Sequence, residues 1–126
     1  MNGPLAAPYS ADEARRAQLK AFLVARRSRL KPGDVGLPET GRRRVDGLRR
    51  EEVAELAGVS SDWYRWFEGG RTARVSSAFL ARLSEALRLD PLDRIALFYL
   101  AVPEVYEAYA AQPVLRPPLQ LHAVTA

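Results

Sequence analysis

The sequence of 126 residues contains no cysteine and one histidine, and these absences exclude several kinds of chemistry. Without cysteine the chain has neither disulfides nor thiolate ligands for a metal. The single histidine, His122, lies near the C-terminal end, so the sequence has no Ser-His-Asp or Cys-His constellation and no two-histidine metal site. We therefore expect a protein that is not an enzyme and that needs no cofactor or metal.

Long apolar runs and regular strand patterns are also missing. No run approaches the ~18 residues of a membrane span, and the N-terminus lacks the charged and apolar regions of a signal peptide. These features predict a cytoplasmic protein without a membrane segment. The chain shows no strand-like alternation and no internal repeat, which predicts an all-α fold.

Positive charge is concentrated in the first half of the chain. Between Arg15 and Arg50 there are 12 Lys or Arg residues against 3 Asp or Glu, whereas from Glu51 onward 7 basic residues face 10 acidic ones. A basic region suits a polyanionic partner, because neutralised phosphates release their counterions. The same charges also fit a solvated basic surface without any partner.

Five segments combine helical spacing of apolar residues with capping signals, at about residues 10–30, 49–57, 61–68, 76–87 and 90–102. Ser10 with Glu13 forms a capping box, and Asp90 followed by Pro91 is a strong helix start. Residues 104–111 add at most a short helical turn after Pro103. We expect a domain over 10–111, a loose arm over 1–9 and an extended or disordered Pro-rich tail over 112–126.

The connection between the first two helices is unusually long. Residues 32–47 contain several prolines and glycines together with Arg42, Arg43 and Arg44. Loops of this length are uncommon inside compact domains and are usually functional or disordered.

The most informative segment is Glu51–Glu68, which reads as two short helices joined by a turn at Gly58. Glycine adopts a positive φ at little cost, so it ends the first helix, and Ser60 is a natural N-cap for the second. Tyr64 and Phe67 then face the core. Two helices joined in this way form a helix-turn-helix, whose second helix fits the major groove of DNA.

Several motifs together resemble the Xre/Cro-type repressor family and, within it, the N-terminal module of MmyB-like regulators. The resemblance covers roughly residues 18–102. It is carried by Asp34-Val35-Gly36-Leu37-Pro38, Gly41-Arg42-Arg43-Arg44, Gly47-Leu48-Arg49-Arg50-Glu51-Glu52-Val53-Ala54, Ser60-Ser61-Asp62-Trp63-Tyr64, Phe67-Glu68-Gly69-Gly70-Arg71 and Leu87-Arg88-Leu89-Asp90. It implies a compact five-helix bundle of the phage-repressor-like type, in a bacterial transcription regulator that binds double-stranded DNA. Many relatives add a C-terminal ligand-binding domain, which we do not find in these residues.

The resemblance implies base contacts from the start and exposed side of the third helix, at Ser61, Asp62, Arg65 and Trp66. The core-facing Tyr64 independently supports outward positions for the last three. Asp62 either accepts a hydrogen bond from the N4 amino group of a cytosine or only interacts favourably with the helix dipole. Trp66 departs from the polar residue usual in relatives, and either touches DNA or packs on the Arg-rich loop. Trp63 is expected to pack rather than to read bases.

The same resemblance implies phosphate contacts that flank the third helix. The candidates are Arg42, Arg43, Arg44, Arg50, Arg71, Thr72 and Arg74. A helix N-terminus attracts anions, which also favours Arg50, whereas Arg42–Arg44 either grip phosphates or are solvated. Arg27 and Glu68 have family counterparts that pair inside the domain, so we expect a structural ion pair.

Two kinds of protein partner are also expected. One recognition helix covers few base pairs, so we expect a homodimer on a palindromic operator. Its interface is expected around Leu97, Phe98 and Tyr99 or around Val105, Tyr106 and Tyr109. The alternative function is an antitoxin-like or regulatory subunit that docks a partner through apolar residues of the 112–126 tail.

Overall fold

The computed structural model describes residues 10–38, 47–71 and 74–111, which form α-helices and no strand. The helices are α2 (Ala11–Ser28), α3 (Arg50–Ala57), α4 (Ser61–Glu68), α5 (Ser77–Ala86), α6 (Pro91–Ala101) and α7 (Pro103–Ala110). A short 3-10 helix, η1 (Pro32–Val35), follows α2. The all-α fold is confirmed. The predicted arm 1–9, the predicted tail 112–126 and Arg42–Arg44 lie outside the described residues.

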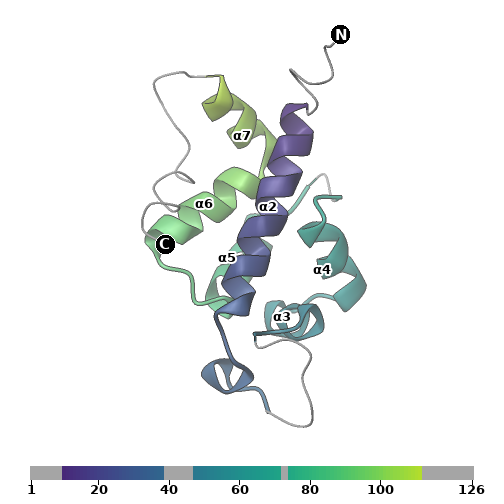
Figure 1. Cartoon of the computed structure of the whole chain (residues 1–126), viewed down its shortest axis with the longest axis vertical. Helices are drawn as coiled ribbons and strands as arrows, with labels where there is room; N and C mark the ends of the chain where they lie inside the picture. The colour runs from purple at the N-terminus through teal and green to yellow at the C-terminus, as the bar shows by residue number, and fades with distance from the viewer. Residues whose placement is uncertain (1–9, 39–46, 72–73, 112–126) are drawn as a thin grey trace.

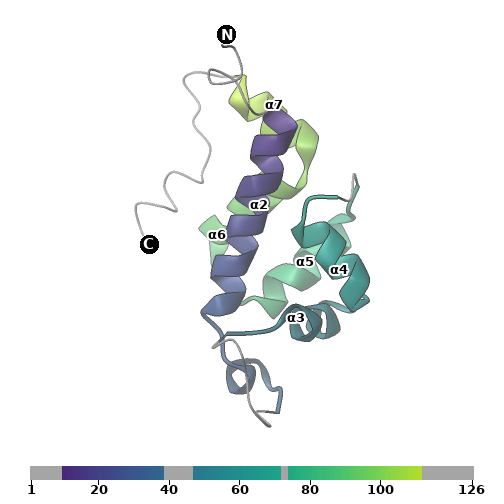
Figure 2. The same cartoon turned by 45° about the vertical axis from the view of Figure 1, so that its right-hand side comes forward.

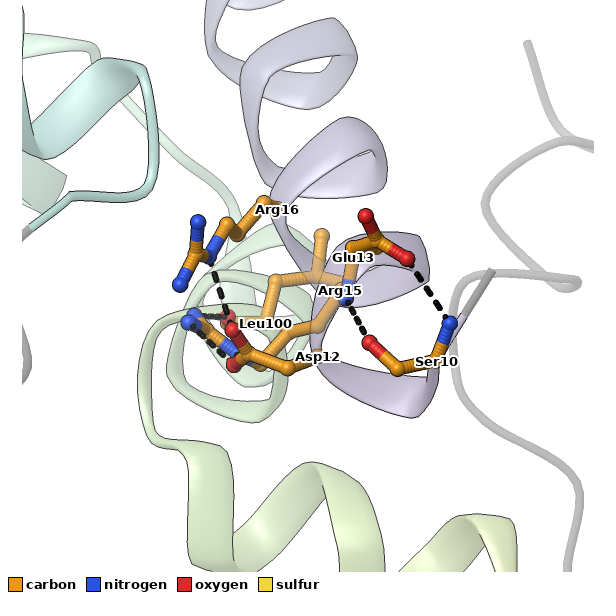
Figure 3. A network of polar contacts seen from close by, with 6 residues as sticks. All are labelled: Ser10, Asp12, Glu13, Arg15, Arg16 and Leu100. Carbon is orange, nitrogen blue, oxygen red and sulfur yellow. Dashed lines mark hydrogen bonds and ion pairs between the residues drawn. The ribbon is translucent and has the colours of Figure 1, made fainter. Parts of the chain in front are cut away.

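The helix starts follow the capping signals of the sequence. The Glu13 N–H donates to Ser10 Oγ at 3.1 Å and the Ser10 N–H donates to Glu13 Oε1 at 3.0 Å, which completes the capping box of α2 (Figure 3). Ser76 and Asp90 accept backbone N–H groups in the same way at the starts of α5 and α6. Each cap satisfies donors that have no partner within the helix.

Within the described residues there are six α-helices and not the five predicted, because residues 103–110 form a complete helix of their own. Val102 has φ −110° and ψ 105°, which interrupts α6, and Pro103 then occupies the first position of α7. Proline suits that position since its missing N–H would be unpaired there anyway. The Tyr106 ring packs against Tyr99 with centroids 4.9 Å apart, so α7 is fixed to the domain.

Helix α2 runs along the long axis of the molecule between two groups of helices. α6 and α7 lie on one side of it, and α3 and α4 lie on the other (Figures 1 and 2). Helix α5 lies behind α2 in the view of Figure 1. One core joins both groups. Its largest fully buried apolar side chains are Tyr64, Tyr99, Phe67, Leu19, Leu23, Leu48, Leu83, Leu87, Leu97, Leu100 and Val53.

A buried arginine connects the start of α2 to the end of α6. Arg15, only 3% exposed, donates from Nη1 to the Leu100 carbonyl oxygen at 2.9 Å and also pairs with Asp12 at 3.1 Å (Figure 3). The last carbonyls of a helix lack partners within it, so Arg15 satisfies one that would otherwise be buried and unpaired. Such a long-range cap is not visible in the sequence.

The turn between α3 and α4 has the expected geometry. Gly58 has φ 76° and ψ 30°, in the left-handed region that glycine adopts most easily. The Val59 N–H donates to the Ala54 carbonyl oxygen at 3.0 Å, a hydrogen bond of the Schellman type. The Trp63 N–H then donates to Ser60 Oγ at 3.0 Å, which starts α4. The chain thus folds as the helix-turn-helix that its sequence predicts.

Candidate nucleic-acid interface

Helix α4 has one buried side and one exposed side. Tyr64, Phe67 and Glu68 are each at most 1% exposed. The four candidate base-contact residues, Ser61, Asp62, Arg65 and Trp66, are exposed, and Trp66 is 54% exposed despite its large apolar ring. The core-facing residues therefore orient α4 so that its other side is open to a partner.

Two of the exposed residues contact each other. Arg65 Nη2 lies 3.2 Å from Asp62 Oδ1, one helical turn away. Exposed pairs of this kind contribute at most about 1 kcal/mol, so the contact orients Arg65 without holding it tightly. The guanidinium has further N–H donors beyond the one used here. Asp62 thus has a role in positioning Arg65, which its place in the first turn did not predict.

The two tryptophans of α4 have different surroundings. The Trp63 ring stacks on Phe67 with centroids 5.8 Å apart and meets Phe79 edge-on at 4.7 Å. Trp63 therefore packs, as expected. Trp66 is exposed and lines a surface hollow together with Arg65 and Arg71.

Arg27 fixes α4 to α2 through a bidentate ion pair. Its Nε lies 2.9 Å from Glu68 Oε2 and its Nη2 lies 3.0 Å from Glu68 Oε1, so the expected pairing is present. Nη1 also donates to the Leu48 carbonyl oxygen at 3.1 Å. One guanidinium thereby joins α2, the segment before α3 and the end of α4.

The buried carboxylate changes the protonation of its neighbours. Burial raises the pKa of Tyr64 well above its ordinary value, and the negative charge of Glu68 raises it further. The Tyr64 hydroxyl donates to Glu68 Oε2 at 3.2 Å, which requires the protonated form. Burial tends to lower the pKa of Arg27, but its hydrogen bonds and attraction to Glu68 outweigh burial and raise it. The cluster therefore keeps both its proton and its ion pair at neutral pH.

Three of the candidate phosphate-contact residues are described, and they line two different hollows. Arg50 and Arg71 line one hollow of about 350 Å³ together with Arg65 and Trp66. Arg74, although exposed, lines a different hollow with residues of the α6–α7 junction. Arg42, Arg43, Arg44 and Thr72 lie outside the described residues.

Sequence reasoning missed Lys20, an exposed residue of α2 that lines the same hollow as Arg50 and Arg71. The spacing between Lys20 and Arg27 could have indicated this position. Residues spaced by three or four positions, or by multiples of a turn, share one side of a helix. Lys20 lies seven positions before Arg27, and Arg27 was already expected to face α4, so Lys20 belongs to the side that faces α4 and its flanking loop.

A second exposed surface lies on α6 and α7. Ile95, Phe98 and Tyr109 are 52%, 47% and 40% exposed and line a hollow of about 500 Å³. The expected dimer interface is therefore corrected in part. Leu97, Tyr99 and Tyr106 are buried in the core, which leaves Phe98, Tyr109 and the half-buried Val105 accessible.

Comparison with known protein families identifies the helix-turn-helix domain. The model of a helix-turn-helix domain family matches residues 11–97, which include α2 to α5 and most of α6. The chain belongs to this family of helix-turn-helix domains. No curated protein and no solved structure matches the chain. Membership in the family points to DNA as a partner of the domain.

The described residues offer neither a metal site nor a membrane span. Over residues 10–38, 47–71 and 74–111, no three His, Cys, Asp or Glu side chains gather closely enough to hold a metal ion. None of the described helices is long and apolar enough to cross a membrane.

Proposed function

We propose that this helix-turn-helix protein is a sequence-specific transcription regulator that places α4 in the major groove of double-stranded DNA. The observation that carries the proposal is the continuity of the exposed side of α4 with the cationic hollow beside it. Arg65 and Trp66 belong to both, and Arg50 and Arg71 complete the hollow. A groove-reading surface next to guanidinium groups matches DNA, in which base edges lie between two phosphate backbones.

The roles of individual side chains follow from where they lie. Arg65 extends from the exposed side of α4 and has donors free for a guanine edge, while Ser61 and Asp62 lie at the helix start. Arg50 and Arg71 flank α4 from α3 and from the following loop, so they are assigned to phosphates. Arg42, Arg43, Arg44, Thr72 and Arg74 remain proposed phosphate contacts on the strength of the family resemblance alone.

Selection of binding sites from a random DNA pool, followed by fluorescence anisotropy on the selected site, tests this function. Arg50→Ala and Arg71→Ala should weaken binding to all sequences about equally, and each should reduce the salt slope by about 1. Arg65→Ala should instead relax preference at one base position by about 1–3 kcal/mol. Arg29→Ala, at an exposed arginine that pairs with Asp93 of α6, is the control and should bind as the wild type does. Failure to enrich any sequence, or binding that is independent of salt, would exclude the proposal.

We further propose that the protein binds DNA as a homodimer through the apolar surface of α6 and α7. Leu92, Ile95, Phe98 and Tyr109 are each at least 40% exposed, and exposed apolar side chains that cluster in this way commonly mark an interface. This surface lies across α2 from α4, so pairing would leave both recognition helices uncovered (Figures 1 and 2). Two half-sites about one DNA turn apart, ~34 Å, would then be read together.

Sedimentation velocity of the wild type and of Phe98→Lys, with and without operator DNA, tests the dimer. Phe98 is exposed, so the substitution should leave the folded domain intact while it opposes pairing. A dimeric wild type and a monomeric variant are expected, together with a symmetric selected site. A wild type that stays monomeric both free and on DNA would instead favour the α6–α7 surface, or the 112–126 segment, as a docking site for a different protein.

A further inference from the structure

The hollow beside α4 is built by three helices and one loop. Lys20 comes from α2, Arg50 from α3, Arg65 and Trp66 from α4, and Arg71 from the segment after α4. It therefore gathers four cationic side chains from parts of the chain that are distant in sequence. Among the described residues that line it, the single carboxylate is that of Glu68.

Glu68 does not cancel the positive charge of this hollow. Its carboxylate is buried, accepts two hydrogen bonds from Arg27 and accepts a third from the Tyr64 hydroxyl. Arg50 Nη1 lies farther away, at 3.9 Å from Glu68 Oε1. Because Arg27 balances the Glu68 charge from within the domain, the positive charge of the lining residues faces outward.

Close contact between α2 and the loop after α4 sets the position of Lys20. A Cβ at Gly70 would lie 2.5 Å from Arg16 Cγ and 2.7 Å from Arg16 Cβ, so the loop backbone lies directly on α2. Lys20 follows Arg16 by one helical turn and Arg71 follows Gly70, which brings both side chains to the same wall of the hollow.

Lys20 also differs from its neighbour Arg16 in its ion pairing. Arg16 Nε lies 2.7 Å from Asp12 Oδ2. Over residues 10–38, 47–71 and 74–111, by contrast, no carboxylate is within ion-pair distance of Lys20 or Arg71. These two charges line one concave surface and have no ion-pair partner among the described residues, which is an arrangement suited to an anion with several oxygens.

We propose that the hollow seats a phosphate group of the DNA backbone and that Lys20 contacts this phosphate from α2. The proposal rests on the function proposed above and adds a contact from outside the helix-turn-helix unit. Arg71, beside Lys20, and Arg50, from α3, bind the same backbone segment. The interface thereby extends along α2, and the first helix of the domain becomes part of the DNA-binding surface.

Salt-dependent anisotropy titrations with Lys20→Ala, Lys20→Arg and Arg29→Ala test the contact. Loss of one phosphate contact should lower the salt slope of Lys20→Ala by about 1, on selected and random DNA alike. Between 50 and 200 mM salt, the wild type should then lose about 3.5-fold more affinity than Lys20→Ala. Lys20→Arg should keep the wild-type slope, and Arg29→Ala should not differ from the wild type. Lys20 is exposed, so circular dichroism and thermal melting should show the same fold for each variant.

Arg50→Ala separates failure of this inference from failure of the proposed function. If Arg50→Ala lowers the slope and Lys20→Ala does not, the contact from α2 is wrong while the DNA-binding function stands. If the wild type itself shows no salt-dependent binding, the proposed function fails.

A free phosphorylated molecule could supply the same chemistry, so inorganic pyrophosphate is titrated by calorimetry without DNA. Micromolar binding that Lys20→Ala abolishes, combined with unchanged DNA binding, would overturn the assignment to the DNA backbone.

Discussion

Arg26 of α2 holds Asp93 of α6 through two hydrogen bonds, although the two residues are 67 positions apart. Nε donates to Oδ2 at 3.0 Å and Nη2 donates to Oδ1 at 3.2 Å. The side chains are only 5% and 3% exposed, and the guanidinium also lies 4.6 Å from the centre of the Phe22 ring. Burial lowers the pKa of Arg26, and the attraction of Asp93 opposes this effect. The pair therefore fixes α6 to α2 at the side away from α4.

The first prediction concerns this buried pair. Asp93→Ala should lower the free energy of unfolding by about 3–5 kcal/mol, because it leaves a buried guanidinium without its charge partner. The double variant Arg26→Met/Asp93→Leu should be less destabilised than Asp93→Ala, since no unpaired charge is left. Urea denaturation measures both. Arg29→Ala is the matched control, because Arg29 reaches the same carboxylate at 3.5 Å but is 58% exposed, and it should cost less than about 1 kcal/mol. A double variant less stable than Asp93→Ala would contradict this account.

The second prediction concerns Glu68. Glu68→Ala should cost about 3–5 kcal/mol of unfolding free energy, because Arg27 and the Tyr64 hydroxyl both lose a buried partner. Glu85→Ala removes a carboxylate that is 76% exposed and paired with Arg94 at 3.0 Å, so it should cost less than about 1 kcal/mol. Thermal and urea unfolding compare the two. Equal losses in the two variants would show that burial of Glu68 has no energetic consequence.

The third prediction is a loss of stability at alkaline pH that depends on Tyr64. The pKa of Tyr64 is raised in the folded protein, by burial and then by Glu68, whereas an unfolded tyrosine ionises near its ordinary value of about 10. Above about pH 10 the unfolded chain therefore binds fewer protons than the folded one, and the free energy of unfolding falls as pH rises. The stabilisation is complete below about pH 10.

Tyr64→Phe tests this dependence. It should cost about 1–3 kcal/mol at neutral pH through the lost hydrogen bond to a charged group, yet its stability should fall less between pH 9 and 11 than that of the wild type. Urea unfolding at a series of pH values gives both curves. In an absorbance titration, the tyrosine that ionises at the highest pH in the wild type should be missing from the variant. If the stability of the two proteins falls identically with pH, the role of Tyr64 is wrong.

The fourth prediction compares two glycines with positive φ. Gly70 has φ +75°, and a Cβ added there would collide with Arg16. Gly36 has φ +79°, but a Cβ added there would have no other atom within 4 Å. Gly36→Ala should cost only the conformational penalty of about 1–2 kcal/mol. Gly70→Ala should cost more, because the loop after α4 must also move away from α2. Urea denaturation measures the difference, and equal costs would mean that the loop and α2 separate easily.

Local features of the fold could be predicted because their causes lie within a few residues. Ser10, Ser76 and Asp90 cap the helices that begin directly after them, and Gly58 adopts the turn conformation that the helix-turn-helix needs. The orientation of α4 also followed, since the burial of Tyr64 and Phe67 dictates which side remains exposed. Over such short separations, sequence spacing determines direction in space.

Long-range pairings could not be predicted in the same way. Asp93 lies in the first turn of α6, a position that by itself indicates only a favourable interaction with the helix dipole, yet it is buried against Arg26. Arg15 and Arg26 counted toward a basic surface, although both are at most 5% exposed and bind partners inside the domain. Each depends on how α2 and α6 pack, which composition does not reveal. The surface available to DNA is therefore less positive than the charge count of the first half of the chain suggests.

The division of α4 into two sides makes it a practical scaffold for engineering. Tyr64, Phe67 and Glu68 anchor this eight-residue helix from its buried side, whereas Ser61, Asp62, Arg65 and Trp66 lie on its exposed side. A library randomised at those four positions should therefore retain most of its members as folded proteins, so that selection acts on target preference rather than on survival of the domain.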